Sequence, residues 1–130
     1  MANQPISSQY NNPIVVTALL SDVDTAGGLV SLINGAGVDL VVLSAVLNVG
    51  TASTGACTVS IGYTATSGTT LSSTLISGQT VASTGTFQSA VANAVRWVNG
   101  KWITASTASG ASAGLVGTLY LTCIPVPAGG

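Results

Sequence analysis

The sequence is nearly devoid of charged and titratable side chains. Its 130 residues contain no histidine and no glutamate, and only five side chains carry a charge: Asp22, Asp24, Asp39, Arg96 and Lys101. Charged residues make up 4% of the chain, against about 25% in a typical soluble domain. General acids, bases, nucleophile partners and metal ligands are therefore scarce. This scarcity argues against an enzyme and against a cofactor.

Three classes of partner or location are also disfavoured. Two basic residues cannot neutralise a series of phosphates, so nucleic-acid binding is not expected. No apolar run reaches the ~18 residues of a spanning helix, so no membrane insertion is expected. The first twelve residues, MANQPISSQYNN, are polar and lack the basic and apolar regions of a signal peptide. We therefore expect synthesis in a cytoplasm.

Two weaker signals are interpreted as structural. Asp22, Asp24 and Gly27 resemble part of a calcium loop, but the third oxygen ligand and the bidentate glutamate are missing. We expect a turn capped by the aspartates, with no metal. Cys57 and Cys123 each lie in an alternating segment, and without a secretory signal two buried free thiols are favoured over a disulfide.

The remaining composition favours β-structure. Hydrophobic residues make up 47% of the chain, and apolar segments separated by Gly, Ser and Thr turns recur about every ten residues, which is typical of a sandwich or barrel. We predict an all-β, antiparallel, jelly-roll-like β-sandwich of about eight strands at 14–124, preceded by an extended N-terminal arm at 1–13 and followed by a tail at 125–130. The expected strands include 14–20, 29–33, 39–49, 57–63 and 115–124.

Several details follow from period-two spacing. We expect a core built from seven residues: Val41, Leu43, Leu47, Val59, Ile61, Leu119 and Leu121. We expect a Ser/Thr/Gly-rich middle at 65–86, held to the core by Leu71, Leu75, Ile76 and Val81, and a loop at 106–114. A strand at 87–91 and a short helix at 89–98 are both compatible with the next segment.

Asn99-Gly100 is the strongest turn signal in the chain. Asn-Gly between apolar segments is typical of a type I′ hairpin, which would pair Val98 with Lys101 and place Trp97 opposite Trp102. Cross-strand aromatic pairing would by itself explain the two tryptophans. Tryptophan and arginine are also frequent interface anchors, so an interface role is a second interpretation.

The shortage of charge favours assembly over a lone monomer with a Ser/Thr-rich surface. Interface cores are depleted of charged residues, and a net charge of −1 gives little repulsion between copies. The candidate interface residues lie in the arm and near the Asn99-Gly100 turn: Gln4, Pro5, Ile6, Tyr10, Arg96, Trp97, Lys101 and Trp102.

The uncharged arm, the strand ACTVSIGY at 56–63, the segment RWVNGKW at 96–102 and the strand GTLYLT at 117–122 occur in that order. Together with the Ser/Thr/Gly-rich turns, this order resembles small β-sandwich structural proteins of tailed bacteriophages. The resemblance implies a virion protein without enzymatic activity, often a homotrimer, that decorates or cements the head by binding the major capsid protein.

Two other functions stay open at this point. The chain could be a tail, baseplate or fibre component that contacts other virion proteins or the host surface. A secreted carbohydrate-binding sandwich is less favoured, because it calls for a signal peptide and for carboxylates beside the aromatic residues.

Overall fold

The computed structural model describes residues 13–21, 28–88 and 94–126. The arm candidates Gln4, Pro5, Ile6 and Tyr10 and the expected turn at Asp22 and Asp24 lie outside these residues. The described residues form nine strands: β1 (Ile14–Ser21), β2 (Val30–Ile33), β3 (Asp39–Thr51), β4 (Cys57–Thr64), β5 (Ile76–Thr80), β6 (Gly85–Gln88), β7 (Val95–Trp97), β8 (Trp102–Gly110) and β9 (Val116–Val126).

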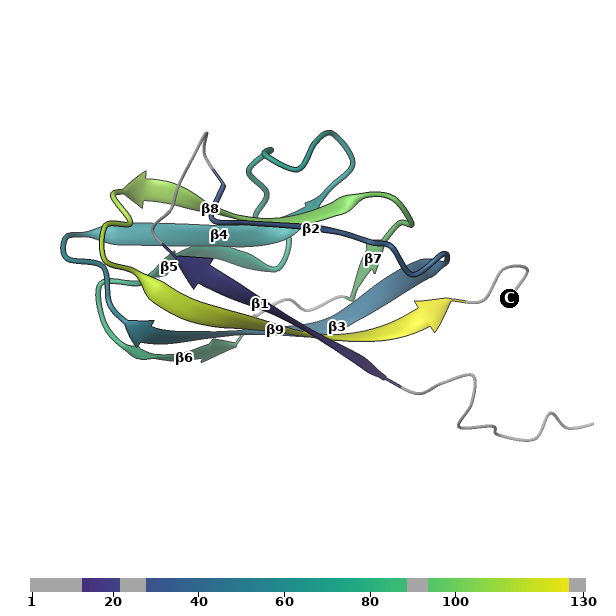
Figure 1. Ribbon diagram of the computed structural model, residues 1–130, viewed down its shortest axis with the longest axis horizontal. Coiled ribbons are helices and arrows are strands. Elements are labelled where there is room, and N and C mark those ends of the chain that lie inside the picture. Colours follow the sequence, from purple (N-terminus) through teal and green to yellow (C-terminus); the bar gives the residue numbers. More distant parts are fainter. Residues whose placement is uncertain (1–12, 22–27, 89–93, 127–130) are drawn as a thin grey trace, which may run out of the picture.

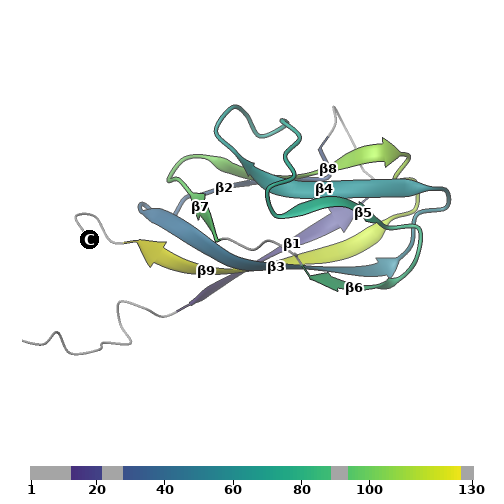
Figure 2. The same ribbon diagram turned by 180° about the vertical axis from the view of Figure 1, so that it is seen from behind.

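The strands form two antiparallel sheets that pack face to face (Figures 1 and 2). One sheet has the order β1-β9-β3-β6, with β7 also paired to β3, and the other has the order β2-β8-β4-β5. If β6 and β7 are taken as two parts of one strand, the first strand pairs with the last, the second with the last but one, and so on inward to β4 and β5. This nested pairing is that of a long hairpin rolled into a jelly roll, which confirms the predicted fold class.

The core lies between the sheets and is continuous. Val59, Ile61, Leu119 and Leu121, all predicted core residues, have no exposed surface, and neither does Leu47. Each of these side chains alternates with an outward neighbour because successive residues of a strand point to opposite faces.

The prediction for the first half of β3 was wrong. Leu43 is 50% exposed and Val41 is only partly covered, whereas Leu40 and Val42 are buried. The cause is a β-bulge: Val42 is opposite Cys123 and Ser44 is opposite Thr122, so Leu43 is an extra residue in the ladder. One extra residue reverses the inward and outward positions that follow it.

The Asn99-Gly100 turn is present, but it does not close a hairpin. Lys101 N donates to Val98 O at 3.0 Å, and Gly100 has a φ of 79°. However, β7 pairs with β3 while β8 pairs with β2 and β4, so the turn connects the two sheets. The backbone after the turn is held instead by Asn34, whose N donates to Lys101 O at 2.8 Å and whose O accepts from Gly100 N at 2.9 Å. The predicted Trp97–Trp102 pair is therefore wrong.

Three further segments differ from expectation. The Ser/Thr-rich middle contains β5 and the start of β6, and Leu75, Ile76 and Val81 are buried as predicted, but Leu71 is 49% exposed. The expected loop at 106–114 is largely strand, because β8 continues to Gly110. No helix forms in the described part of 89–98, where β7 lies, and β9 continues to Val126, two residues beyond its predicted end.

Both cysteines are buried and free. Cys57 lies on β4 and Cys123 lies on β9, in opposite sheets. Burial raises the pKa of both thiols, and that of Cys123 rises to about 11. The prediction of two buried free thiols is confirmed.

Candidate functional site

The two outer faces of the sandwich differ in how far the described chain covers them itself. Residues 65–75 lie over the outside of the β4–β8 pair (Figure 1). Ser72 Oγ donates to Tyr63 O at 2.7 Å, and Thr104 Oγ1 donates to Thr70 O at 2.7 Å. Thr104 points outward from β8 yet has no exposed surface. The protein's own loop therefore covers this part of the face, while Ile33 at the β2 edge stays 60% exposed.

A glycine on β4 makes the close contact of this loop possible. A Cβ on Gly62 would collide with Ser72 Oγ and would lie 2.5 Å from Thr74 N. Both neighbours belong to the covering loop, and Thr74 Oγ1 also accepts a hydrogen bond from Tyr63 N at 2.8 Å. Since only glycine leaves room for the loop, the loop is a built part of the fold.

The outer face of the β1-β9-β3 sheet has no such cover among the described residues, and it carries large apolar side chains. Leu19 is 66% exposed, Val15 is 63% exposed and Tyr120 is 40% exposed. The strand register places Val15 beside Thr122, Thr17 beside Tyr120, and Leu19 beside Thr118, so apolar and threonine side chains alternate across the strands. Leu43 on β3 and Val116 on β9 add to the exposed apolar surface. We call the outer face of β1, β9 and β3 the open face.

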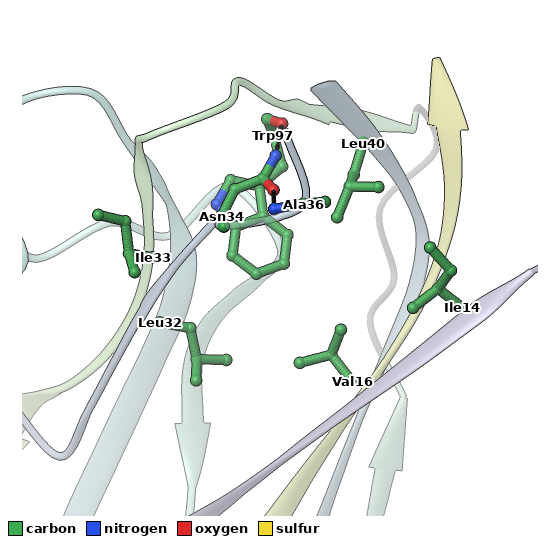
Figure 3. Close-up of a pocket in the computed structure, with 9 residues that line it drawn as sticks. Ile14, Val16, Leu32, Ile33, Asn34, Ala36, Leu40 and Trp97 are labelled. Carbon is green, nitrogen blue, oxygen red and sulfur yellow. Dashed lines mark hydrogen bonds between the residues drawn. The ribbon is translucent and has the colours of Figure 1, made fainter. Parts of the chain in front are cut away.

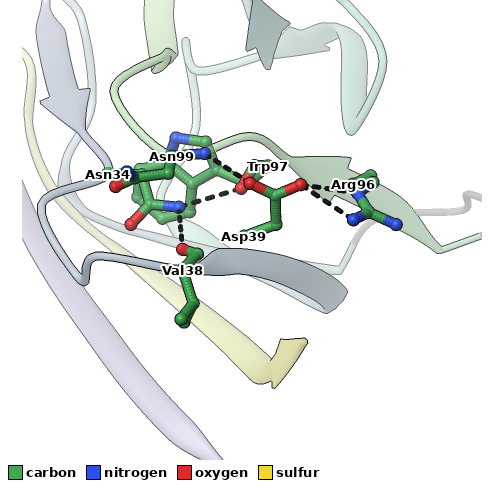
Figure 4. Close-up of polar contacts among 6 residues, drawn as sticks. All are labelled: Asn34, Val38, Asp39, Arg96, Trp97 and Asn99. Carbon is green, nitrogen blue, oxygen red and sulfur yellow. Dashed lines mark hydrogen bonds and ion pairs between the residues drawn. The ribbon is translucent and has the colours of Figure 1, made fainter. Parts of the chain in front are cut away.

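Among the described residues, charged side chains lie at only one corner of the open face. There Arg96 on β7 and Asp39 on β3 form an ion pair, with 2.8 Å between Arg96 Nη2 and Asp39 Oδ2 (Figure 4). Asn99 N also donates to Asp39 Oδ1 at 2.8 Å. These two contacts, the backbone bond first and the Arg96 side chain second, lower the pKa of Asp39. The paired charges leave the rest of the open face uncharged.

Asn34 ties the same end of the molecule together. Its Nδ2 donates to Trp97 O at 2.9 Å and to Val38 O at 3.0 Å (Figure 4), and its Oδ1 accepts from Ala36 N at 2.9 Å. Asn34 is 3% exposed, so these bonds satisfy a buried amide. They hold the β2–β3 turn against β7.

The four candidate residues near the turn do not form one cluster. Arg96 is exposed and paired with Asp39, whereas Trp97 faces the core opposite Leu40 and is 2% exposed. Lys101 Nζ lies 5.8 Å from the ring centroid of Trp102. Trp102 is half-buried on the other sheet, so Lys101 and Trp102 form a separate surface pair.

The open face was not among the predicted sites. Its residues lie on strands whose apolar side chains point in both directions, as in IVVTALLS of β1. In a sequence, such a strand cannot be told from one covered on both sides. The signal that was available is the absence of charge throughout β1 and β9.

No helix in the described residues is long and apolar enough to cross a membrane. Within the same residues, no three acidic, cysteine or histidine side chains gather into a group that could hold a metal ion.

Comparison with known proteins identifies the fold and no sequence family. No protein-family model matches the chain, and no curated protein matches it in sequence. Solved structures do match: a chain of the cyanophage Pam1 capsid has a TM-score of 0.67 at 17% identity, covering 97% of this chain and 94% of that chain. A chain of the Ralstonia phage GP4 capsid has a TM-score of 0.60 at 18% identity, covering 98% and 92%.

A chain of the acid-stable capsid of Helicobacter pylori bacteriophage KHP30 is also similar, with a TM-score of 0.57 at 18% identity over 86% of each chain. At these identities the likeness is one of fold. Because each match spans most of both chains, the similar chains are of nearly the same length as this one, and the shared fold is the whole domain.

Proposed function

We propose that this chain is a non-enzymatic structural protein of a tailed-phage virion, and that it decorates the head by binding the protein shell through its open face. The observation that carries the proposal is the contrast between the two outer faces. Residues 65–75 cover the part of one face around Gly62 and Thr104, whereas no described segment covers the other face, where Leu19 is 66% and Val15 is 63% exposed. Several large exposed apolar side chains grouped on one sheet face are typical of an interaction site.

The chemistry of the open face suits a protein partner. Interface cores are poor in Lys, Glu and Asp and rich in aromatic and aliphatic groups, and the open face has Tyr120, Val15 and Leu19 with threonines between them. Because the sheet beneath is held by a continuous core, docking requires no reordering of the strands. Many copies bound to one shell would make modest individual contacts sufficient.

The likeness of fold supports the virion assignment. The similar chains belong to capsids of three phages, and they match 86–98% of this chain. A small domain of this kind is suited to an accessory position on a shell. The homotrimer and the major capsid protein as docking partner are expectations of the same proposal.

Two described side chains with reactive potential, Asp39 and Cys123, are engaged in structure. The Asp39 carboxylate accepts hydrogen bonds from Asn99 N and Arg96 Nε, each at 2.8 Å. The Cys123 thiol is buried, and its pKa of about 11 keeps it protonated at neutral pH. These observations support a structural role.

The test is binding to heads assembled without the protein. The purified chain should co-sediment with such heads and raise their resistance to heat, and a variant with a charge on the open face, Val15→Lys, should not bind. Ser83→Lys is the control, because Ser83 is exposed in the β5–β6 turn, outside the open face. Binding of the unmodified chain to tails or host cells, and not to heads, would favour the tail, baseplate or fibre alternative.

A further inference from the structure

An apolar groove opens where the edges of the two sheets meet. It has a volume of about 180 Å³ and lies between β1 of one sheet and β2 of the other, with Trp97 at its base (Figure 3). Its lining side chains are almost all apolar: Ile14, Val16, Leu32, Ile33, Ala36, Leu40 and Trp97. None of them is charged, and Ile33 at the rim is 60% exposed.

We propose that this groove receives the side chain of Ile6 from the N-terminal segment of a second copy of this chain. The segment 1–12 is uncharged in its side chains and contains Ile6 among Gln, Ser and Asn. The groove is likewise uncharged. The inference concerns association of copies in solution and does not depend on head binding.

The size of the groove fits one side chain of this kind. A protein cavity of about 150 Å³ lined by apolar groups holds benzene, so 180 Å³ accommodates one branched or aromatic side chain and not two. Ile6 and Tyr10 are the large apolar side chains of the segment after Met1. Ile6 needs no hydrogen-bond partner in an apolar groove, whereas the Tyr10 hydroxyl would lose its solvent there.

The reach of the segment also selects Ile6. Eight residue steps separate Ile6 from Ile14, which corresponds to at most about 26–29 Å of extended chain. Ile14 itself lines the groove, so two copies that meet at this edge bring each groove close to the start of the other's segment. Tyr10 is only four steps from Ile14, about 13–14 Å at most, so Ile6 has twice the reach and allows more arrangements of the two copies.

Proline at position 13 favours insertion into a neighbour over folding back onto the same chain. Proline has no N–H, so Pro13 cannot donate the hydrogen bond that closes a tight hairpin with β1. It also restricts the residue before it to extended backbone. Because Ile14 is already in the ladder opposite Cys123, a reverse turn would have no room at 13–14. A tight turn directly before β1 is therefore disfavoured, which favours the groove of a neighbour.

The edge of β1 provides a second contact for the incoming segment. β1 is the end strand of its sheet, and its described pairing is with β9 alone. Its sequence, IVVTALLS, has none of the charges or prolines that protect edge strands. An extended uncharged segment can add to such an edge by main-chain hydrogen bonds while one side chain fills the groove.

The first experiment asks which chain supplies the segment. One protein carries Ser7→Cys and another carries Ala36→Cys. Ala36 is exposed and lines the groove. The native Cys57 and Cys123 are buried and stay unreactive. The two proteins are mixed under mild oxidation and separated on a non-reducing gel. We expect a disulfide-linked pair of one of each. Replacing Ala36→Cys with Ser83→Cys, at an exposed site in the β5–β6 turn, should abolish it.

The second experiment blocks the groove. Gly35 lines the groove, has no neighbouring atom within 4 Å of the position that a Cβ would occupy, and lacks a positive φ. The fold therefore tolerates a side chain there, and we expect Gly35→Trp to obstruct the groove. Gly55 is equally unobstructed and lies in the β3–β4 turn, so Gly55→Trp is the matched control. In sedimentation equilibrium, Gly35→Trp and Ile6→Ala should each weaken association by roughly tenfold to a hundredfold, and Gly55→Trp and Tyr10→Ala should not do so.

Three results would overturn the proposal. One is a monomer across the micromolar range. A second is a disulfide that does not form between the two single-cysteine proteins but does form within one chain that carries both Ser7→Cys and Ala36→Cys. The third is association that Gly35→Trp leaves unchanged. If the groove is filled only when heads are added, its occupant is the shell protein, and the inference about copies of this chain is wrong while the proposed function stands.

Discussion

Truncating Leu19 to alanine should weaken binding to heads and leave the fold intact. Leu19 is outward on β1, 66% exposed in the free protein and beside Thr118 of β9. Burying a complete leucine side chain is worth about 1.5–3 kcal/mol. Two-thirds of this side chain remains to be buried on docking, so its removal should cost about 1–2 kcal/mol of binding free energy per copy.

That free energy corresponds to an affinity loss of about 5- to 30-fold, since 1.4 kcal/mol is a factor of ten. The free energy of unfolding should change by less than about 0.5 kcal/mol, because an exposed side chain contributes little to folding. The assay is a titration of labelled protein onto heads, read as bound copies against free concentration. Denaturant unfolding of the same preparations checks the fold.

Leu71→Ala is the matched control, because it is the same chemical change at similar exposure. Leu71 is 49% exposed, and it belongs to the loop that covers the opposite face. Its truncation should leave head affinity within a factor of two. Equal losses for Leu19→Ala and Leu71→Ala, or a loss for Leu71→Ala alone, would refute the assignment of the open face as the docking surface.

Three other predictions test the structure itself. Leu47→Ala should lower the free energy of unfolding by about 2–5 kcal/mol, whereas Leu43→Ala should change it by less than about 0.5 kcal/mol; equal losses in denaturant titration would contradict the bulge in β3. The lowered pKa of Asp39 means that its stabilising contribution is present above its ordinary pKa of about 3.9 and is lost as the pH falls through the lower folded value. In the Asp39→Asn variant, the free energy of unfolding should therefore fall less between neutral and acidic pH than it does in the unmodified protein. An equal fall in both proteins would contradict the Asp39–Arg96 ion pair. A thiol reagent at pH 8 should label neither Cys57 nor Cys123 in the folded protein and should label both in denaturant; rapid labelling of the folded protein would contradict their burial.

The strand content was predictable because each alternating segment carries its own signal. β4, Cys57–Thr64, follows the predicted pattern of inward Cys57, Val59 and Ile61. Which residues of β3 point into the core was not predictable, because Val41, Val42 and Leu43 are all apolar and either face of the strand could be inward. The bulge is decided by pairing with β9, and that information is distant in the sequence.

The Asn99-Gly100 turn shows the same division between local and long-range information. Its dipeptide correctly predicted a reversal, with Lys101 N bonded to Val98 O. The strands on either side of the reversal pair with distant partners, β7 with β3 and β8 with β2 and β4, and the Asn34 backbone binds Gly100 and Lys101. Nothing within 96–102 indicates that partner, so the predicted hairpin was wrong although the turn was right.

The open face could not be inferred from composition, because whether a residue is exposed depends on which other segments of the folded chain cover it. Apolar residues on both sides of β1 and β9 are compatible with a strand buried on both faces. The structure shows that the covering loop, 65–75, packs on Gly62 of the other sheet. The shortage of charged residues pointed to contact with other proteins, and the fold shows that the open face is available for that contact.

The most direct test of the account is an electron cryomicroscopy reconstruction of heads with the protein bound, compared with heads that lack it. The account predicts added density on the head surface that fits the jelly roll, with Val15, Leu19 and Tyr120 facing the shell and residues 65–75 facing outward. Density with the covered face against the shell, or no added density on heads at saturating protein, would contradict it.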